Sequence, residues 1–348
     1  MSEENAGLDR YLRRLPKVDL HCHLDGAVRT RTLLELARRQ NIPLPADNER
    51  DLNRFVQVTA ACRSLAEFLD AFNHIVPVLR SPEALERVAY ELCEDCRADG
   101  IHYVEARFAP MLCVKRGFSA EEALSAALRG LEKGKRDFGV QSGLIVCLLR
   151  NHSPEENRGA FNALCRLFGR GAVGMDLAGD EKQFSTKLFA DYFEEAKSKS
   201  IPTTCHAGEI EGAENLKTAL ELGVDRIGHG IHILQDESCV NAALKAGIPL
   251  EIGLTSNAYS KAVPSLARHP LLPLFKKGLT VTLNTDDRGV LGIDLTHEYR
   301  RALELGIPVE GLQKISINGV RSLFAPPALK SQLERQFTQE MEKLYASP

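Results

Sequence analysis

Short apolar runs alternate with amphipathic helical stretches along most of this chain, and this pattern restricts the fold more than any other feature. Strand-like runs begin near residues 17, 101, 142, 172, 201, 226, 248 and 279. Helical patterns separate them, for example over 120–138, 187–199, 213–222 and 237–246. Eight strands joined by helices, several of which end at a glycine, predict a closed parallel (β/α)₈ TIM barrel rather than an open doubly wound sheet.

The sequence also predicts two helical additions to this barrel. Residues 28–99, between the first two strands, read as extra helices inserted after strand one, and a helical C-terminal tail begins at about residue 309. Barrels of this class commonly hold more than about 250 residues as one domain. We therefore expect a single barrel domain over residues 1–348.

Composition and charge exclude several classes of protein. The net charge of −3 gives no general attraction for nucleic acid or an anionic membrane. The chain starts with acidic residues and no apolar segment, and it contains no run of about 18 apolar residues, so we expect a soluble cytoplasmic protein. Nine cysteines without a framework spacing indicate reduced thiols.

Polar side chains gather where five of the predicted strands end. In a parallel barrel these ends meet at one face, which is where such folds place their active sites. The clusters are His21-Cys22-His23-Leu24-Asp25, Asp176 to Glu181, His206-Ala207-Gly208-Glu209, Gly228-His229-Gly230 and Asn284-Thr285-Asp286-Asp287.

The first cluster suggests a metal site. His21 and His23 lie two residues apart on a strand, so their rings point to the same side and can converge on one ion. Three histidines and a carboxylate are a plausible ligand set for one zinc, which would make a water molecule nucleophilic near neutral pH.

Each polar group taken alone has a structural explanation. Asp286-Asp287 could be a solvated turn, His229 a buried structural histidine, and Glu209 an exposed carboxylate near the start of a helix. Only their joint placement at successive strand ends favours a catalytic site.

An ordered series of segments resembles the adenosine deaminase family of metal-dependent amidohydrolases over nearly the whole chain. The segments are PKVDLHCHLDGA, YVEARFAP, GMDLAGDE, CHAGE, RIGHGIH, LTSN at 254–257, and LNTDD. The resemblance implies hydrolytic deamination of adenosine and 2′-deoxyadenosine to inosine and 2′-deoxyinosine plus ammonia, a reaction of purine salvage. The partner would be a small purine nucleoside, with no nucleic acid and no membrane.

The resemblance also implies a role for individual residues. One Zn²⁺ per chain would be bound by His21, His23, His206 and Asp286, and His23 would also contact the substrate.

The same resemblance implies the acid–base groups and the remaining substrate contacts. Glu209 would donate a proton to purine N1, His229 would act as base toward the attacking water, and Asp287 would hold that water and contact the substrate. Gly179 would bind purine N3 through its backbone N–H, and Asp25 would bind the ribose 5′-hydroxyl.

Two positions depart from the family pattern, so the rim of the site could read the sugar or ring differently. Arg288 follows Asp287 where proline is common, and Gly253-Leu254 stands before Thr255 where Cys-Pro is common. A relative that acts on another 6-aminopurine nucleoside, such as aminodeoxyfutalosine or an N6-substituted adenine compound, is therefore an alternative.

Two further readings are less favoured. An inactive barrel kept as a binding protein is disfavoured because Glu209, His229 and Asp287 are all present. A binuclear hydrolase is disfavoured because strand four ends without a lysine that could be carboxylated as a bridge. The oligomeric state is predicted only as a monomer or a weak dimer.

Several other patterns carry no function in this interpretation. The glycines of 169–174 match a dinucleotide fingerprint in letters, but they lead into a strand instead of opening a helix. Cys93 and Cys96 belong to a helical core stripe. Cys22 and Cys205 should point away from the ligand face by strand alternation. The His-x-Glu and Pro-Cys-x-x-Cys motifs of cytidine-deaminase zinc sites are absent from the sequence.

Overall fold

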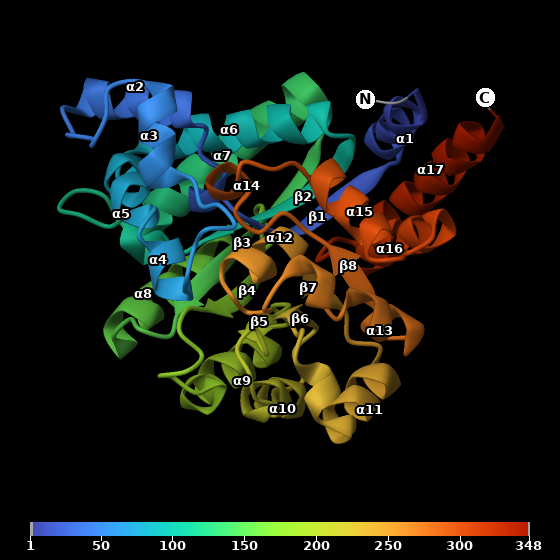
Figure 1. Ribbon diagram of the computed structural model, residues 1–348. Coiled ribbons are helices and arrows are strands. Elements are labelled where there is room, and N and C mark those ends of the chain that lie inside the picture. Colours follow the sequence, from blue (N-terminus) through green and yellow to red (C-terminus); the bar gives the residue numbers. More distant parts are fainter. Residues whose placement is uncertain (1–2, 347–348) are drawn as a thin grey trace.

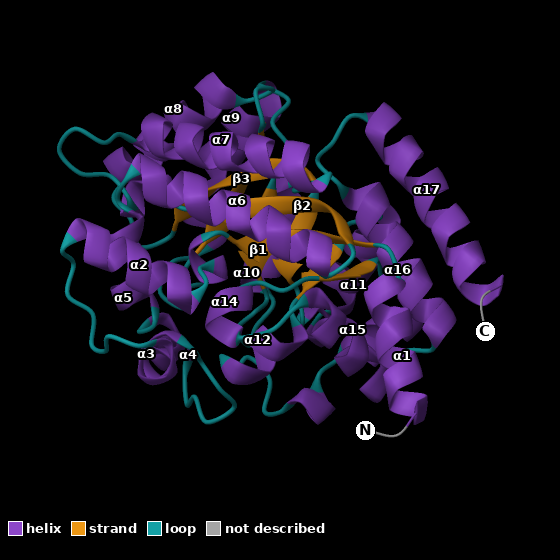
Figure 2. Cartoon of the chain, turned by 90° about the horizontal axis from the view of Figure 1, so that it is seen from above, coloured by secondary structure: helices purple, strands orange, loops and turns teal. Residues whose placement is uncertain are grey.

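A computed structural model describes residues 3–346 and shows eight strands at the centre of the molecule, with helices around them (Figures 1 and 2). The strands are β1 (Lys17–His23), β2 (Ile101–Phe108), β3 (Gln141–Leu149), β4 (Ala172–Ala178), β5 (Thr204–Ala207), β6 (Arg226–His229), β7 (Leu250–Ile252) and β8 (Val281–Leu283). Neighbours pair in parallel, in the orders β1-β2-β3-β4 and β5-β6-β7-β8.

Short backbone contacts join these two half-sheets. Between β4 and the segment before β5, the N–H of Met175 donates to the carbonyl of Pro202 at 2.9 Å. On the other side, the N–H of His23 donates to the carbonyl of Asp286 at 2.7 Å, and the N–H of Asp286 donates to the carbonyl of His21 at 2.8 Å. These contacts close the ring, so the predicted (β/α)₈ architecture is confirmed.

Helices alternate with the strands as predicted, and the helices predicted at 120–138, 213–222 and 237–246 form close to those ranges. The helices that cover the strands include α6 (Pro82–Ala98), α7 (Ala120–Phe138), α8 (Pro154–Leu167), α9 (Ala190–Ser198), α10 (Glu214–Leu222), α11 (Glu237–Ala246), α13 (Leu271–Lys276) and α15 (Leu295–Glu304). The predicted helix at 187–199 forms as a 3₁₀ turn over Thr186–Phe189 followed by α9.

Local sequence explains where these helices begin and end. At α7 the hydroxyl of Ser119 accepts from the N–H of Glu122, and the Glu122 carboxylate accepts from the N–H of Ser119, which is a capping box. Gly139 ends the helix with φ 74°, a conformation that costs glycine little. Ser153 and Glu156 form the same capping box at α8.

The predicted insert and tail are both helical. The insert contains α2 (Thr30–Gln40), α3 (Glu49–Val56), α4 (Leu65–Leu69), α5 (Phe72–Ile75) and a 3₁₀ turn over Val76–Leu79. The tail contains α16 (Val309–Ser322) and α17 (Pro327–Ala346). Insert and tail lie on opposite sides of the barrel, and α1 (Glu3–Arg14) lies on the side of the tail (Figures 1 and 2).

No helix in the described range 3–346 is both long and apolar enough to span a membrane. The expectation of a single domain over residues 1–348 stays a prediction.

Candidate active site

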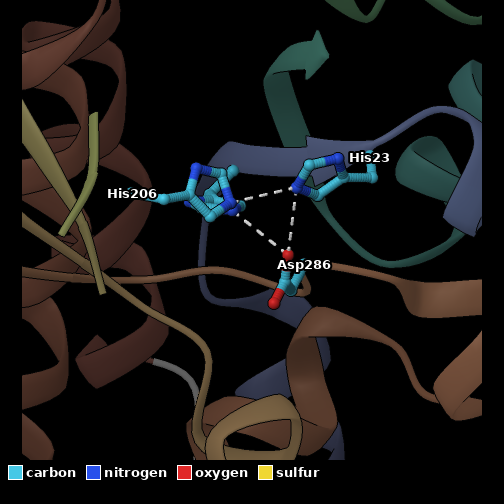
Figure 3. A group of neighbouring side chains, drawn as sticks. His23, His206 and Asp286 are labelled. Carbon is cyan, nitrogen blue, oxygen red and sulfur yellow. Dashed lines mark hydrogen bonds and ion pairs between the residues drawn. The ribbon is translucent and has the colours of Figure 1, made fainter. Parts of the chain in front are cut away.

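The four predicted metal ligands converge at the carboxyl end of the barrel. His21 and His23 come from β1, His206 from β5 and Asp286 from the turn after β8. Figure 3 shows His23, His206 and Asp286 pointing toward one another. One ligand atom from each residue lies within 4.8 Å of the others. The Nε2 atoms of His21 and His23 lie 3.1 Å and 3.4 Å from Asp286 Oδ1, and the Nε2 atoms of His23 and His206 are 3.4 Å apart.

The outer nitrogens of two of these histidines are held by carboxylates. His21 Nδ1 lies 2.9 Å from Glu251 Oε2, and His206 Nδ1 lies 3.0 Å from Asp176 Oδ2. Each ring thus donates its N–H outward and turns the lone pair of Nε2 toward the cluster. The buried Nε2 of His21 has no hydrogen-bond partner in the described part of the chain. Converging lone pairs beside a carboxylate fit a divalent metal ion.

A buried arginine on β2 holds both of these carboxylates. The guanidinium of Arg107 lies 3.1 Å from Asp176 Oδ2 and 2.9 Å from Glu251 Oε2. Burial opposes ionisation of Asp176, but His206 and Arg107 hold the pKa of its carboxyl well below the usual range. Arg107 therefore keeps two anions in place behind the histidines. This role was not predicted from the sequence, although the charged residue inside the apolar strand IHYVEARF was a signal for it.

The predicted acid–base groups surround the cluster. Glu209 follows β5 and His229 ends β6, with 3.7 Å between Glu209 Oε2 and His229 Nε2. His229 adopts φ 63°, which is uncommon outside glycine and turns its ring into the site. Burial lowers the pKa of His229, so the ring is neutral near pH 7. The hydroxyl of Ser260 donates to Glu209 Oε1 at 3.5 Å.

Asp25 and Asp287 are two further buried carboxylates in the site. The Oδ1 atom of each has no hydrogen-bond partner within residues 3–346. Burial raises the pKa of Asp25 to about 6. Burial, together with the charges of Asp286 and Asp25, raises the pKa of Asp287 well above its usual value. A Cβ atom at Gly26 would lie 1.8 Å from Asp287 Oδ1, so only glycine fits beside this carboxylate.

These groups line a pocket of ≈ 500 Å³. We call one side the strand-end wall, which comprises His23, Asp25, Ala178, Gly179, His206, Glu209, His229, Asp286 and Asp287. We call the other side the insert wall, which comprises Leu65, Phe68, Leu69, Phe72, Asn73, Val76, Pro77 and Arg80. A larger cavity of ≈ 790 Å³ lies at the opposite end of the barrel and contains none of the predicted site residues.

Sequence comparison agrees with this geometry. The sequence model of the adenosine deaminase family matches residues 16–339. The chain belongs to the adenosine deaminase family. An adenosine deaminase from Clostridium acetobutylicum is 37% identical over 321 residues, which cover 92% of this chain and 96% of that protein.

Solved structures of related proteins share the fold over nearly the full length. An adenine deaminase from Arthrobacter aurescens superimposes with a TM-score of 0.86 at 27% identity and covers 94% of this chain and 99% of its own. An amidohydrolase from Burkholderia ambifaria with bound zinc has a TM-score of 0.87 at 25% identity and covers 98% and 96%. Membership of the adenosine deaminase family makes the protein a hydrolase that acts on C–N bonds.

Glu181, a buried glutamate after β4, holds the backbone segment that carries Glu209. Glu181 Oε2 accepts from the N–H of Gly208 at 2.9 Å, and Oε1 accepts from the N–H of Glu209 at 3.1 Å. Burial raises the pKa of Glu181 to about 7, and the charge of Glu209 adds to this effect. The sequence analysis placed Glu181 at a strand end but gave it no role.

The two departures from the family pattern lie behind the pocket. Arg288 is buried, with its guanidinium 3.7 Å from Cys96 Sγ, and it does not line the cavity. Gly253 and Leu254 do not line it either. The expectation that these positions form part of the rim is therefore wrong, because the short helices after β7 and β8 turn them toward the core.

The patterns set aside as non-functional are structural. Cys22 and Cys205 lie in the core outside the pocket lining, and burial raises the pKa of both thiols. Cys93 and Cys96 are buried on α6. Gly169 and Gly171 lie in the turn that leads into β4, with φ 76° at Gly169, and Gly174 lies within β4. Among the described residues, the only cluster suited to a metal ion is the one at the strand ends.

Proposed function

We propose that this protein hydrolyses the 6-amino group of adenosine and 2′-deoxyadenosine, giving inosine and 2′-deoxyinosine plus ammonia. The observation that carries the proposal is the convergence of a four-ligand metal cluster with Glu209, His229 and Asp287 around one pocket. The similarity to an adenosine deaminase from Clostridium acetobutylicum supports the choice of a nucleoside substrate.

The proposed cofactor is one Zn²⁺ per chain, held by His21, His23, His206 and Asp286. Histidine nitrogens with one carboxylate oxygen are a ligand set that zinc prefers, and the bound zinc of the Burkholderia ambifaria amidohydrolase supports this identity. When bound, zinc supplies Lewis acidity that lowers the pKa of a water molecule to near neutrality.

The protein's own groups then act on the two reaction partners. Glu209 lines the pocket and would give its proton to purine N1, which draws electron density from C6 and makes that carbon open to attack. His229 and Asp287 lie on the same side of the pocket and would orient the attacking water. Glu181 would help by fixing the backbone of Glu209.

The remaining strand-end groups would position the nucleoside. Gly179 lines the pocket with φ 100°, a conformation that costs glycine little, and its backbone N–H would bind purine N3. Asp25 and His23 would face the ribose, with the carboxylate of Asp25 accepting from the 5′-hydroxyl. The insert wall would cover the apolar faces of the substrate.

A panel of 6-aminopurines tests this proposal against its alternatives. The zinc-loaded protein is incubated with adenosine, 2′-deoxyadenosine, adenine, AMP, N6-methyladenosine and aminodeoxyfutalosine, and deamination is followed by ultraviolet absorbance. We expect the highest kcat/KM for the first two compounds, loss of activity on chelation, and recovery with zinc. A higher kcat/KM for another compound would reassign the substrate, and no turnover of any compound would favour a binding protein.

A further inference from the structure

A chain of hydrogen bonds runs outward from His229 through residues that the proposed reaction does not use. His229 Nδ1 lies 3.0 Å from the side-chain nitrogen of Asn257 on α12 (Leu254–Tyr259). Asn257 Oδ1 lies 3.2 Å from His269 Nε2, and His269 Nδ1 lies 3.1 Å from the backbone nitrogen of Leu271. The three side chains are at most 4% exposed, so water does not complete these contacts.

The hydrogen bond at Leu271, farthest from His229, determines which atom donates and which accepts in the other hydrogen bonds of this series. A backbone N–H can only donate, so the N–H of Leu271 requires an unprotonated Nδ1 on His269. Burial, together with the nearby His229 and His232, lowers the pKa of His269 to about 3, so the ring is neutral. Its single proton therefore lies on Nε2 and is donated to Asn257 Oδ1.

The orientation of the Asn257 amide follows from this donor. With Oδ1 accepting from His269, the amide nitrogen faces His229 Nδ1 and can only donate to it. The reversed amide would place N–H groups of Asn257 and His269 against each other. His229 Nδ1 must therefore be an acceptor without a proton, which leaves Nε2 as the ring nitrogen that carries the proton.

Hydrogen bonds to Glu298 fix the helix that carries Asn257, so Asn257 can determine which nitrogen of His229 carries the proton. The carboxylate of Glu298 accepts from the backbone N–H groups of Leu254 and Thr255, the latter at 3.2 Å, and also from the Thr255 hydroxyl. These bonds fix the first turn of α12, which carries Asn257.

We propose that Asn257 and His269 are positioning residues that hold His229 in the tautomer with its proton on Nε2. The catalytic meaning of this tautomer rests on the proposed function. His229 Nε2 faces the pocket, 3.7 Å from Glu209 Oε2. A neutral ring in this tautomer donates a hydrogen bond to the attacking oxygen and does not accept its proton, whereas the sequence resemblance makes His229 the base.

Replacing Asn257 with aspartate distinguishes a His229 that donates a hydrogen bond from a His229 that acts as a base. Asn257→Asp keeps the shape and still accepts from His269, but its second oxygen requires a donor, so the proton of His229 moves to Nδ1. In serine proteases the wrong histidine tautomer lowers kcat by about 10⁴. We expect kcat to fall at least about a hundredfold with KM and zinc content near wild type. Wild-type or higher turnover would show that His229 acts as a base and would overturn the proposal.

Control variants separate this effect from added charge and from a loss of folding. Asn241→Asp adds the same charge at an exposed position of α11 and should leave kcat unchanged. His269→Gln keeps one acceptor and one donor, whereas His269→Phe has neither, so the phenylalanine variant should lose about tenfold more kcat than the glutamine variant. Equal turnover in both His269 variants and the wild type would also overturn the proposal.

The tautomer can be read without any substrate. Nitrogen-15 NMR of histidine-labelled, zinc-loaded protein distinguishes protonated from unprotonated ring nitrogens, and His229→Gln identifies the signals of His229. We expect an unprotonated Nδ1 in the wild type and a protonated Nδ1 in Asn257→Asp. A protonated Nδ1 in the wild type contradicts the inference whatever the enzyme acts on. The predicted tautomer in a protein that deaminates no 6-aminopurine would reject the proposed function instead.

Discussion

The two walls of the pocket differ in what their side chains are and in how they are held. The strand-end wall is polar, and the predicted metal ligands His206 and His21 are fixed from behind by Asp176, Glu251 and Arg107, which are fully buried. The insert wall is largely apolar and belongs to short helices, and Leu69 within it is 49% exposed. Under the proposed function, the strand-end wall would carry the chemistry and the insert wall would bind the apolar surface of the substrate.

This division predicts different kinetic effects for the two walls. A change in the metal ligands or acid–base groups of the strand-end wall removes an interaction made in the transition state and lowers kcat. A change in the insert wall removes binding that substrate and transition state share, so it raises KM and leaves kcat unchanged.

The largest expected effect in a metal-loaded variant comes from Glu209→Gln in the strand-end wall. The amide cannot pass a proton to purine N1, so kcat should fall by about 10² to 10⁴ while zinc content and fold are retained. Glu211→Gln makes the same change two residues further on, at an exposed position, and should have no effect on kcat. A near-normal kcat for the metal-loaded Glu209→Gln variant would show that another group supplies the proton.

The next effect concerns the charge of Asp25. Its pKa of about 6 leaves the carboxyl ionised at pH 8, where it would repel a 5′-phosphate. Two charges about 4 Å apart interact by about 4 kcal/mol at an effective dielectric constant of about 20, which corresponds to roughly a thousandfold in kcat/KM. We expect the wild type to prefer adenosine to AMP by up to this factor, and Asp25→Asn to narrow the preference substantially.

Arg80 in the insert wall allows a charge change of the opposite sign as a control for Asp25→Asn. Its Nε donates to the carbonyl of Leu112 at 3.0 Å, and its guanidinium lines the same pocket as Asp25. Arg80→Gln removes a positive charge and should widen the preference for adenosine if a 5′-phosphate reaches it. Comparable wild-type rates on AMP and adenosine would reject the role of Asp25 and move the substrate toward nucleotides.

The smallest effect is expected in the insert wall. Leu69→Ser removes a half-buried apolar side chain from the pocket, which is worth about 1 kcal/mol of binding or roughly fivefold in KM, with kcat unchanged. Leu244→Ser is the matched control, because Leu244 is also exposed but lies on α11 away from the pocket. A lower kcat with unchanged KM for Leu69→Ser would contradict the expectation that the insert wall contributes to binding alone.

Periodicity and strand-end chemistry made most of the barrel predictable from the sequence. The apolar runs marked all eight strands, although β5, β7 and β8 begin at Thr204, Leu250 and Val281, slightly later than the runs near 201, 248 and 279 suggested. The ligands were predictable because spacing along a strand and position at a strand end fix where a side chain points.

Contacts between distant residues could not be predicted in the same way. Arg107 reaches Asp176 across 69 residues, and His21 reaches Glu251 across 230 residues. Asn257 and His269 gain their proposed role only because the turn before α13 places the N–H of Leu271 on the His269 ring. A charge within an apolar strand signals that Arg107 is buried, but the partners in such networks are set by tertiary packing, which neither local propensity nor periodicity shows.

Metal content measured together with turnover tests the central claim that the strand-end wall holds one catalytic metal. The wild type and the His21→Ala/His23→Ala variant are purified in parallel, analysed for metals, and assayed with adenosine. We expect about one zinc per chain and active deamination in the wild type, and neither bound zinc nor turnover in the double variant. Two metals per wild-type chain, or a double variant that keeps its metal and its activity, would contradict the account.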